Sequence, residues 1–218
     1  MPTILTDVET RVLGSLVEKQ VTTPEYYPLT LNSLTVACNQ KNNRNPVTSY
    51  SEEQIAQALE SLREKNLAYV YYGSTSRVPK YKHVMPEVMH LNIQEMALMC
   101  ALMLRGPQTP GELRSNASRL YGFSGLEEIE ETLNALIMRD SEPLVVRLPR
   151  QQGQKEVRFA QLLNGEVAVE EMPESPAPRR GTAPHLDRVA KLEEDMTTLK
   201  TQMGELQRQF EEFRTQFE

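Results

Sequence analysis

The side chains best suited to chemistry are cations that gather in predicted loops and hairpins. Lysine and arginine bind the phosphates of nucleic acid, and asparagine amides reach base edges and sugars. The pattern predicts contacts with double-stranded DNA. An alternative stays open, because exposed hairpins also carry Lys and Arg to protect their edges, and asparagine-rich loops supply turns. The candidates are Lys41, Asn43 and Arg44 in one loop, Arg77, Lys80 and Lys82 in a first hairpin, and Arg147, Arg150, Lys155 and Arg158 in a second.

Carboxylates concentrate on two predicted helices. Like charges near phosphates offset part of any specific contact, so we expect neither helix to enter a DNA groove deeply. Glutamates at a helix start also interact favourably with the macrodipole, which explains them without catalysis. They leave a second function open, a protein-protein interaction adaptor that binds a basic partner. These residues are Glu52, Glu53 and Glu60 on the first helix, and Glu127, Glu128, Glu130 and Glu131 on the second.

Residue types and spacings typical of enzymes are missing from the sequence. It lacks a Gly-rich phosphate loop, a nucleophile elbow and a pair of histidines at metal-ligand spacing. Cys38 and Cys100 lie among apolar residues, where we expect reduced thiols in the core. We therefore expect no enzymatic activity, no cofactor and no metal.

Helix starts are marked by capping boxes, in which a Ser, Thr or Asn side chain and a Glu or Gln three residues later bond each other's backbone N–H. The pairs that fit are Thr6 with Glu9, Ser51 with Gln54, Asn92 with Glu95, Thr109 with Glu112, and Ser124 with Glu127. Apolar positions at helical spacing follow each pair. A triplet of them occurs twice: Ile55, Leu59 and Leu62 return 74 residues later as Ile129, Leu133 and Leu136.

The order of elements is also repeated. Three helices, over residues 6–19, 30–39 and 51–66, precede strands at 67–71 and 78–84, and the second copy ends in strands at 144–148 and 156–162. This order predicts a mainly α protein with small β-hairpins (α+β), built as tandem winged helix-turn-helix domains over residues 1–88 and 89–165.

The remaining sequence differs in composition. Residues 166–185 are rich in Pro and charge, which predicts a flexible linker. Residues 186–218 carry a heptad pattern that predicts a coiled-coil helix and a homodimer, although the helix could instead pack on its own chain. Its core positions are Val189, Leu192, Met196, Leu199, Met203, Leu206, Phe210, Phe213 and Phe217.

Charge and hydropathy place the chain in solution. The formal net charge is −6, and most of it comes from residues 166–218, where 7 Lys and Arg face 12 Asp and Glu. Apolar runs are far shorter than the roughly 20 residues that cross a bilayer, and the N-terminal sequence lacks a secretory signal pattern. We expect a cytoplasmic protein that does not enter membranes.

Long strings of residues resemble a known family. RVLGSLVEKQVTTPEYYPLTLNSLTVACNQKNNRNPV (residues 11–47), TPGELRSNASRLYGFS (109–124) and PLVVRLPR (143–150) are similar to the uncharacterised bacterial YceH family. The resemblance implies two winged-helix domains. No activity is established for that family, so the resemblance carries over no catalytic or binding residues to this sequence.

Overall fold

Helices dominate the computed structural model, which describes residues 4–72, 78–150, 156–165 and 204. Small antiparallel sheets accompany them, so the mixed α+β class is confirmed. All elements named below lie in one compact unit, Met1–Glu170. Within this unit, residues 4–90 form a first segment and residues 91–165 form a second segment.

The first segment contains three principal helices followed by a hairpin. Its elements are α1 (Asp7–Thr22), the 3-10 turn η1 (Pro24–Tyr26), β1 (Leu29–Thr30), α2 (Leu31–Cys38), α3 (Glu52–Glu64), β2 (Ala68–Tyr71), β3 (Lys80–His83) and α4 (Met85–Met89). The three strands form one antiparallel sheet in the order β1-β3-β2. The predicted helices and both predicted strands are present, whereas β1 and α4 were not predicted. Both are short, and periodicity gives little signal at such lengths.

The second segment has the same order with shorter connections. Its elements are α5 (Ile93–Arg105), α6 (Pro110–Ala117), α7 (Leu126–Ile137), β4 (Val145–Arg147) and β5 (Phe159–Gln161). β4 and β5 pair in an antiparallel two-stranded sheet.

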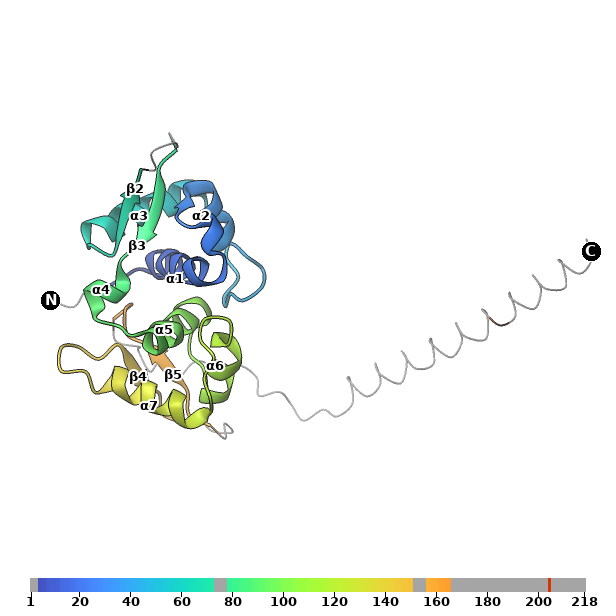
Figure 1. The fold of residues 1–218 in the computed structure, drawn as a ribbon, viewed down its shortest axis with the longest axis vertical. Helices are drawn as coiled ribbons and strands as arrows, with labels where there is room; N and C mark the ends of the chain where they lie inside the picture. The colour runs from blue at the N-terminus through green and yellow to red at the C-terminus, as the bar shows by residue number, and fades with distance from the viewer. Residues whose placement is uncertain (1–3, 73–77, 151–155, 166–203, 205–218) are drawn as a thin grey trace, which may run out of the picture. The chain divides into compact units, whose positions relative to one another are not determined.

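The first helices of the two segments form the centre of the unit. In Figure 1, α1 and α5 lie between α3 with the β2–β3 hairpin on one side and α7 with the β4–β5 hairpin on the other. The thiol of Cys100 on α5 donates to the carbonyl oxygen of Gly14 on α1 at 3.4 Å. A Cβ on Gly14 would lie 3.0 Å from Leu104 Cδ2, so glycine permits this close approach.

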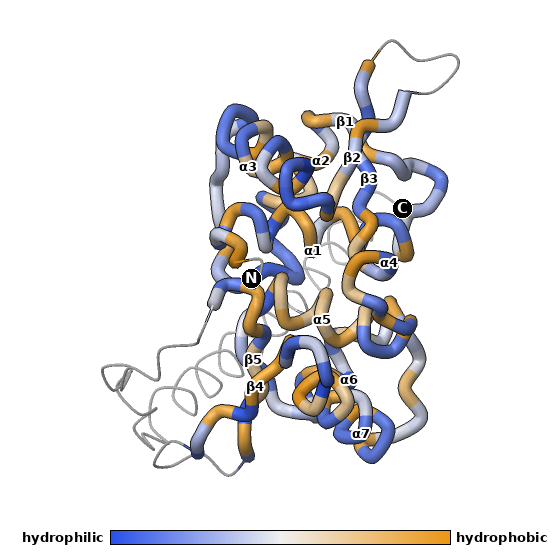
Figure 2. Tube along the Cα trace, turned by 90° about the vertical axis from the view of Figure 1, so that its left-hand side faces the viewer, coloured by the Kyte–Doolittle hydropathy of each residue, from blue (hydrophilic) through white to orange (hydrophobic). Residues whose placement is uncertain are grey.

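Apolar residues of α5 supply much of the shared core. Figure 2 shows this helix as largely hydrophobic, and eight consecutive residues, 97–104, are buried. The repeated triplets are buried too, since all six side chains are at most 1% exposed. The two segments therefore share one continuous hydrophobic core.

Capping boxes begin four of the five helices for which we predicted them: α1, α3, α5 and α6. The prediction for Ser124 and Glu127 is wrong. Gly125 is the N-cap of α7, and Glu128 accepts instead from the backbone N–H and hydroxyl of Ser124, both at 2.8 Å. The helix begins one residue later than expected, which moves the carboxylate at the third helical position from Glu127 to Glu128.

The described part of the chain contains no helix long and apolar enough to span a membrane. The predicted linker at 166–185 and the coiled-coil helix at 186–218 lie outside the described residues, apart from Gly204. The same holds for all nine predicted oligomerisation residues: Val189, Leu192, Met196, Leu199, Met203, Leu206, Phe210, Phe213 and Phe217.

Candidate nucleic-acid interface

The β2–β3 hairpin presents aromatic and cationic side chains on a common face. Tyr69 lies opposite Lys82, and Tyr71 lies opposite Lys80. Because side chains alternate across a strand, these four residues share one side of the hairpin. Tyr69 is 37% and Tyr71 45% exposed, and both lysines are partly exposed. We call this group the Tyr–Lys face.

The opposite side of the hairpin fixes it to the core. Ala68 and His83 are buried there, and Tyr81 packs against the core. The backbone N–H of His83 donates to the Tyr27 hydroxyl at 2.9 Å, and the two rings meet edge to face. Burial, with a smaller effect of the Lys82 charge, lowers the pKa of His83 to about 4. A neutral His83 therefore attaches the hairpin to the core, and the Tyr–Lys face lies on the other side of the hairpin.

The Tyr–Lys face carries side-chain groups that can bind phosphate. The ammonium of Lys82 lies 5.8 Å from the centre of the Tyr69 ring, which is a cation–π contact. Lysine ammonium and tyrosine hydroxyl groups both bind phosphate oxygens of nucleic acid. Lys80 and Lys82 were predicted from the sequence as candidate contacts, whereas Tyr69 and Tyr71 were not. Their alternation with the buried Ala68 is the signal that would have placed them outward.

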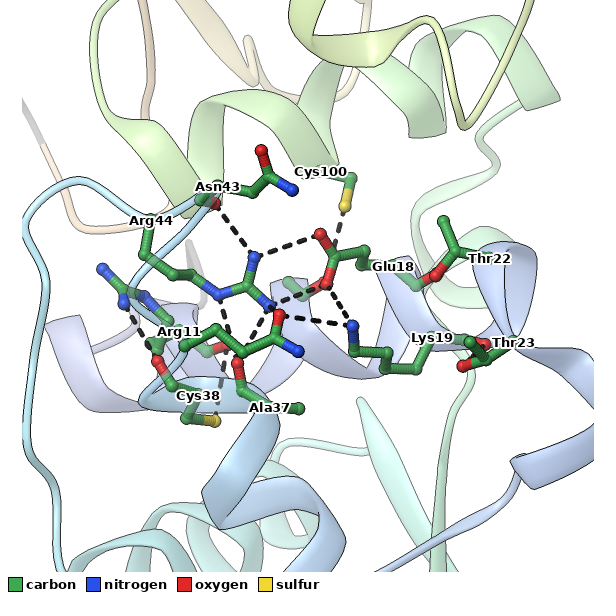
Figure 3. A network of polar contacts seen from close by, with 12 residues as sticks. Arg11, Glu18, Lys19, Thr22, Thr23, Ala37, Cys38, Asn43, Arg44 and Cys100 are labelled. Carbon is green, nitrogen blue, oxygen red and sulfur yellow. Dashed lines mark hydrogen bonds and ion pairs between the residues drawn. The ribbon is translucent and has the colours of Figure 1, made fainter. Parts of the chain in front are cut away.

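Arg44 is buried, which corrects its predicted role. Its side chain is 0% exposed, and its guanidinium binds both carboxylate oxygens of Glu18, at 3.0 and 2.7 Å, and the carbonyl of Ala37 (Figure 3). Burial alone would raise the pKa of Glu18, but Arg44 and Lys19 lower it. A phosphate cannot reach this guanidinium, so the prediction that Arg44 contacts nucleic acid is wrong.

The neighbours of Arg44 in the same loop lie closer to the surface. Lys41 and Asn43 are exposed. The Asn43 side-chain oxygen accepts from Arg105 of α5, so this amide holds the loop to the second segment. Lys41 keeps its charge available, whereas Asn43 is already engaged.

The cations of the second hairpin differ in whether their charges are free to bind phosphate. Arg147 and Arg150 are exposed. Arg158 binds both oxygens of Glu112, at 3.0 and 3.1 Å, and the carbonyl of Pro107. Its charge is largely satisfied within the protein. Two further candidates, Arg77 in the first hairpin and Lys155 in the second, lie outside the described residues.

The predicted acidic residues lie on two separate surfaces. Figure 1 shows α3 and α7 on opposite sides of the central pair of helices, so the two groups cannot form one patch. Most of these carboxylates are exposed, while Glu128 is partly buried and bound to Ser124. Some are partnered: Glu60 pairs with Arg63 at 2.5 Å, and Glu52 accepts from Asn32 at 3.1 Å. The exposed members are Glu52, Glu53 and Glu60 on α3, and Glu127, Glu130 and Glu131 on α7.

The described ranges contain no candidate metal site. No cluster of three or more His, Cys, Asp or Glu side chains there could hold a metal ion. Cys38 and Cys100 are free and buried, as expected, and burial raises the pKa of Cys38 to about 11 and that of Cys100 further.

The chain is similar to a family model and to several bacterial proteins. A family model described as "Protein of unknown function, DUF480" matches residues 5–154. A UPF0502 protein of Opitutus terrae is 50% identical over 197 residues, which cover 90% of this chain and 84% of that protein. One from Geotalea uraniireducens is 49% identical over 98% of both chains, and one from Vibrio atlanticus is 40% identical over 94% of this chain and 96% of its own. With the family model covering more than half of the sequence and such relatives covering nearly all of it, the chain belongs to the DUF480 (UPF0502) family.

Proposed function

We propose that this protein is a non-enzymatic regulatory protein that associates with double-stranded DNA through the Tyr–Lys face. The observation that carries the proposal is the register of β2 and β3, which sets two exposed tyrosines beside two lysines on an anchored hairpin. Lys41, Arg147 and Arg150 would add phosphate contacts from exposed positions. Few cations are involved, so binding should be weak and strongly dependent on salt.

The architecture proposed with this function is a tandem of winged helix-turn-helix domains. Its support is the order of three helices and a hairpin, which occurs in both segments. In such domains the third helix usually reads the major groove. Here α3 and α7 carry exposed glutamates, which repel phosphate, so the proposed contact uses hairpins and loops with little reading of base sequence.

Titration of a labelled DNA duplex at low salt tests the proposal. The replacement K80A/K82A should weaken binding strongly, and Y69A/Y71A should weaken it to a smaller extent because the lysine charges remain. The matched control R63A/R114A removes two exposed charges from α3 and α6 and should bind like the unaltered protein. Absence of binding, or equal losses in all three variants, would refute the Tyr–Lys face as the contact.

A second candidate function is a protein-protein adaptor. The observation that favours it is the exposure of Glu52 and Glu53 on α3 and of Glu127, Glu130 and Glu131 on α7. A basic partner would be held at either helix. Charge reversal at these glutamates should abolish nucleic-acid-free capture of such a partner, and undiminished capture would exclude the acidic helices.

Self-association through residues 186–218 is a further part of the proposal. Its support is the uninterrupted heptad of apolar residues in the sequence. Light scattering of the full chain should give the mass of a dimer, and deletion from Leu186 onward should reduce it to that of a monomer. A full-length monomer would contradict the coiled coil.

A further inference from the structure

A polar cavity of about 390 Å³ lies between the two segments. The first segment contributes the end of α1 and the loop at residues 40–43, and the second contributes α5, α6 and the residues after α6. Its polar lining includes Lys19, Lys41, Asn42, Arg105 and Arg119. Ligand sites commonly form at such junctions and at this size.

Positive charge exceeds negative charge in this cavity. Four cations line it, Lys19, Lys41, Arg105 and Arg119, against the single carboxylate of Glu18. That carboxylate is already neutralised, because Arg44 binds both of its oxygens and Lys19 lies 3.1 Å away (Figure 3). Within the described ranges Lys41, Arg105 and Arg119 form no ion pair with a carboxylate.

Arg105 is the best-placed of these cations. It ends α5, and its guanidinium donates to the side-chain oxygen of Asn43 across the junction. Burial, and after it the nearby Arg44 charge, lowers the pKa of Arg105, and the Glu18 charge offsets only part of this shift. A cation held partly buried beside another cation, with no anion of its own in the described structure, is stabilised when an anion binds.

The uncharged lining residues offer hydrogen bonds but, in the described part of the chain, no aromatic ring on which a base could stack. Side chains of Asn42 and Arg119 form no hydrogen bond with the described part of the chain, so their donors are available. Ala101, Leu104 and Leu120 give the cavity a small aliphatic wall, and none of the described lining residues is aromatic. A nucleobase would therefore find no ring on which to stack.

We propose that this cavity binds a small, multiply charged oxyanion without an aromatic ring, of the class of sugar bisphosphates, pyrophosphate or tricarboxylates. Arginine forks and amides hold such groups through charge-assisted hydrogen bonds. A bound anion would join the loop at 40–43 to α5 and the residues after α6, and would stabilise the junction of the two segments. This site is separate from the Tyr–Lys face and does not depend on the proposed association with DNA.

Calorimetric titration of the full-length protein tests the site, with fructose 1,6-bisphosphate, pyrophosphate, citrate and ATP as probes at fixed ionic strength. Saturable binding of at least one of the first three, with ATP binding no more tightly than pyrophosphate, is the expected result. Failure of all three to bind would overturn the proposal. Clearly tighter binding of ATP than of pyrophosphate would also overturn it, since the adenine would then be recognised.

Variants identify the cavity as the place of binding. R119A and R105Q/R119A should weaken the best probe by about tenfold or more, whereas R114A on the exposed side of α6 should not. Arg119 is exposed, so the R119A variant should fold normally. If R119A bound the best probe with unchanged affinity, the proposal would be overturned even if R105Q/R119A were unstable. None of these residues belongs to the Tyr–Lys face, and K80A/K82A should leave oxyanion binding intact. Loss of one activity is thus distinguishable from loss of the other.

Discussion

Replacement of Arg44 by alanine should destabilise the protein strongly. The guanidinium is fully buried, and it donates to Glu18, to the carbonyls of Ala37 and Asn43, and to the side chain of Gln40. Without it, Glu18 stays in a site where its side chain is only 12% exposed. Removing one partner of a buried ion pair costs about 3–5 kcal/mol in free energy of unfolding. Because Lys19 remains near Glu18, we expect R44A to lose about 3 kcal/mol in free energy of unfolding, the lower end of this range.

Urea unfolding of R44A at neutral pH measures this loss. R63A is the matched control: it breaks the exposed Glu60–Arg63 pair and should cost about 1 kcal/mol or less. The pKa of Glu18 is lowered in the folded state from an ordinary value of 4.5. The stability that this carboxylate contributes is therefore present above pH 4.5 and is lost as the pH falls through the folded pKa, so the gap between R44A and the unaltered protein should narrow in acid. Equal, small losses for R44A and R63A would refute the structural role of Arg44.

Three further predictions concern the core. Replacing Gly14 by alanine should lower the free energy of unfolding by about 1–3 kcal/mol, because the new Cβ would lie 3.0 Å from Leu104. Alanine is otherwise the better helix residue, so a gain in stability would show that α1 and α5 can move apart freely. Burial lowers the pKa of His83 from 6.5 to about 4, so between these pH values the imidazole is protonated in the unfolded state and neutral in the folded state. The free energy of unfolding should therefore fall by up to about 3 kcal/mol as the pH drops from 6.5 to 4. Urea unfolding of H83Q against pH should lack that loss, and an unchanged profile would contradict the assignment. Cys38 and Cys100 should react with a thiol reagent only after unfolding, as followed by absorbance; rapid reaction of the native protein would contradict their burial.

Local signals in the sequence were sufficient for most of the fold. Capping boxes located the starts of four helices because the two bonding partners are only three residues apart. The same reasoning failed at α7, where Ser124 and Glu127 fit the pattern but Gly125 has the cap conformation. A pattern of residue types does not specify which backbone turn the chain adopts.

The candidate site was less accessible from sequence, because it depends on contacts between distant residues. Arg44 lies in a polar loop and has the composition of a surface cation, yet its counter-charge, Glu18, comes from α1. The cavity lined by Arg105 and Arg119 arises only where the two segments meet. Neither feature has a local pattern that predicts it.

The salt dependence of duplex binding measures how many phosphate contacts Lys80 and Lys82 make. Each phosphate contact contributes a slope of about −0.9 to the plot of log affinity against log salt concentration. If Lys80 and Lys82 both contact phosphate, K80A/K82A should make this slope shallower by about 2, and R63A/R114A should leave it unchanged. A slope for K80A/K82A equal to that of the unaltered protein, or no binding of duplex at low salt, would contradict the proposed function.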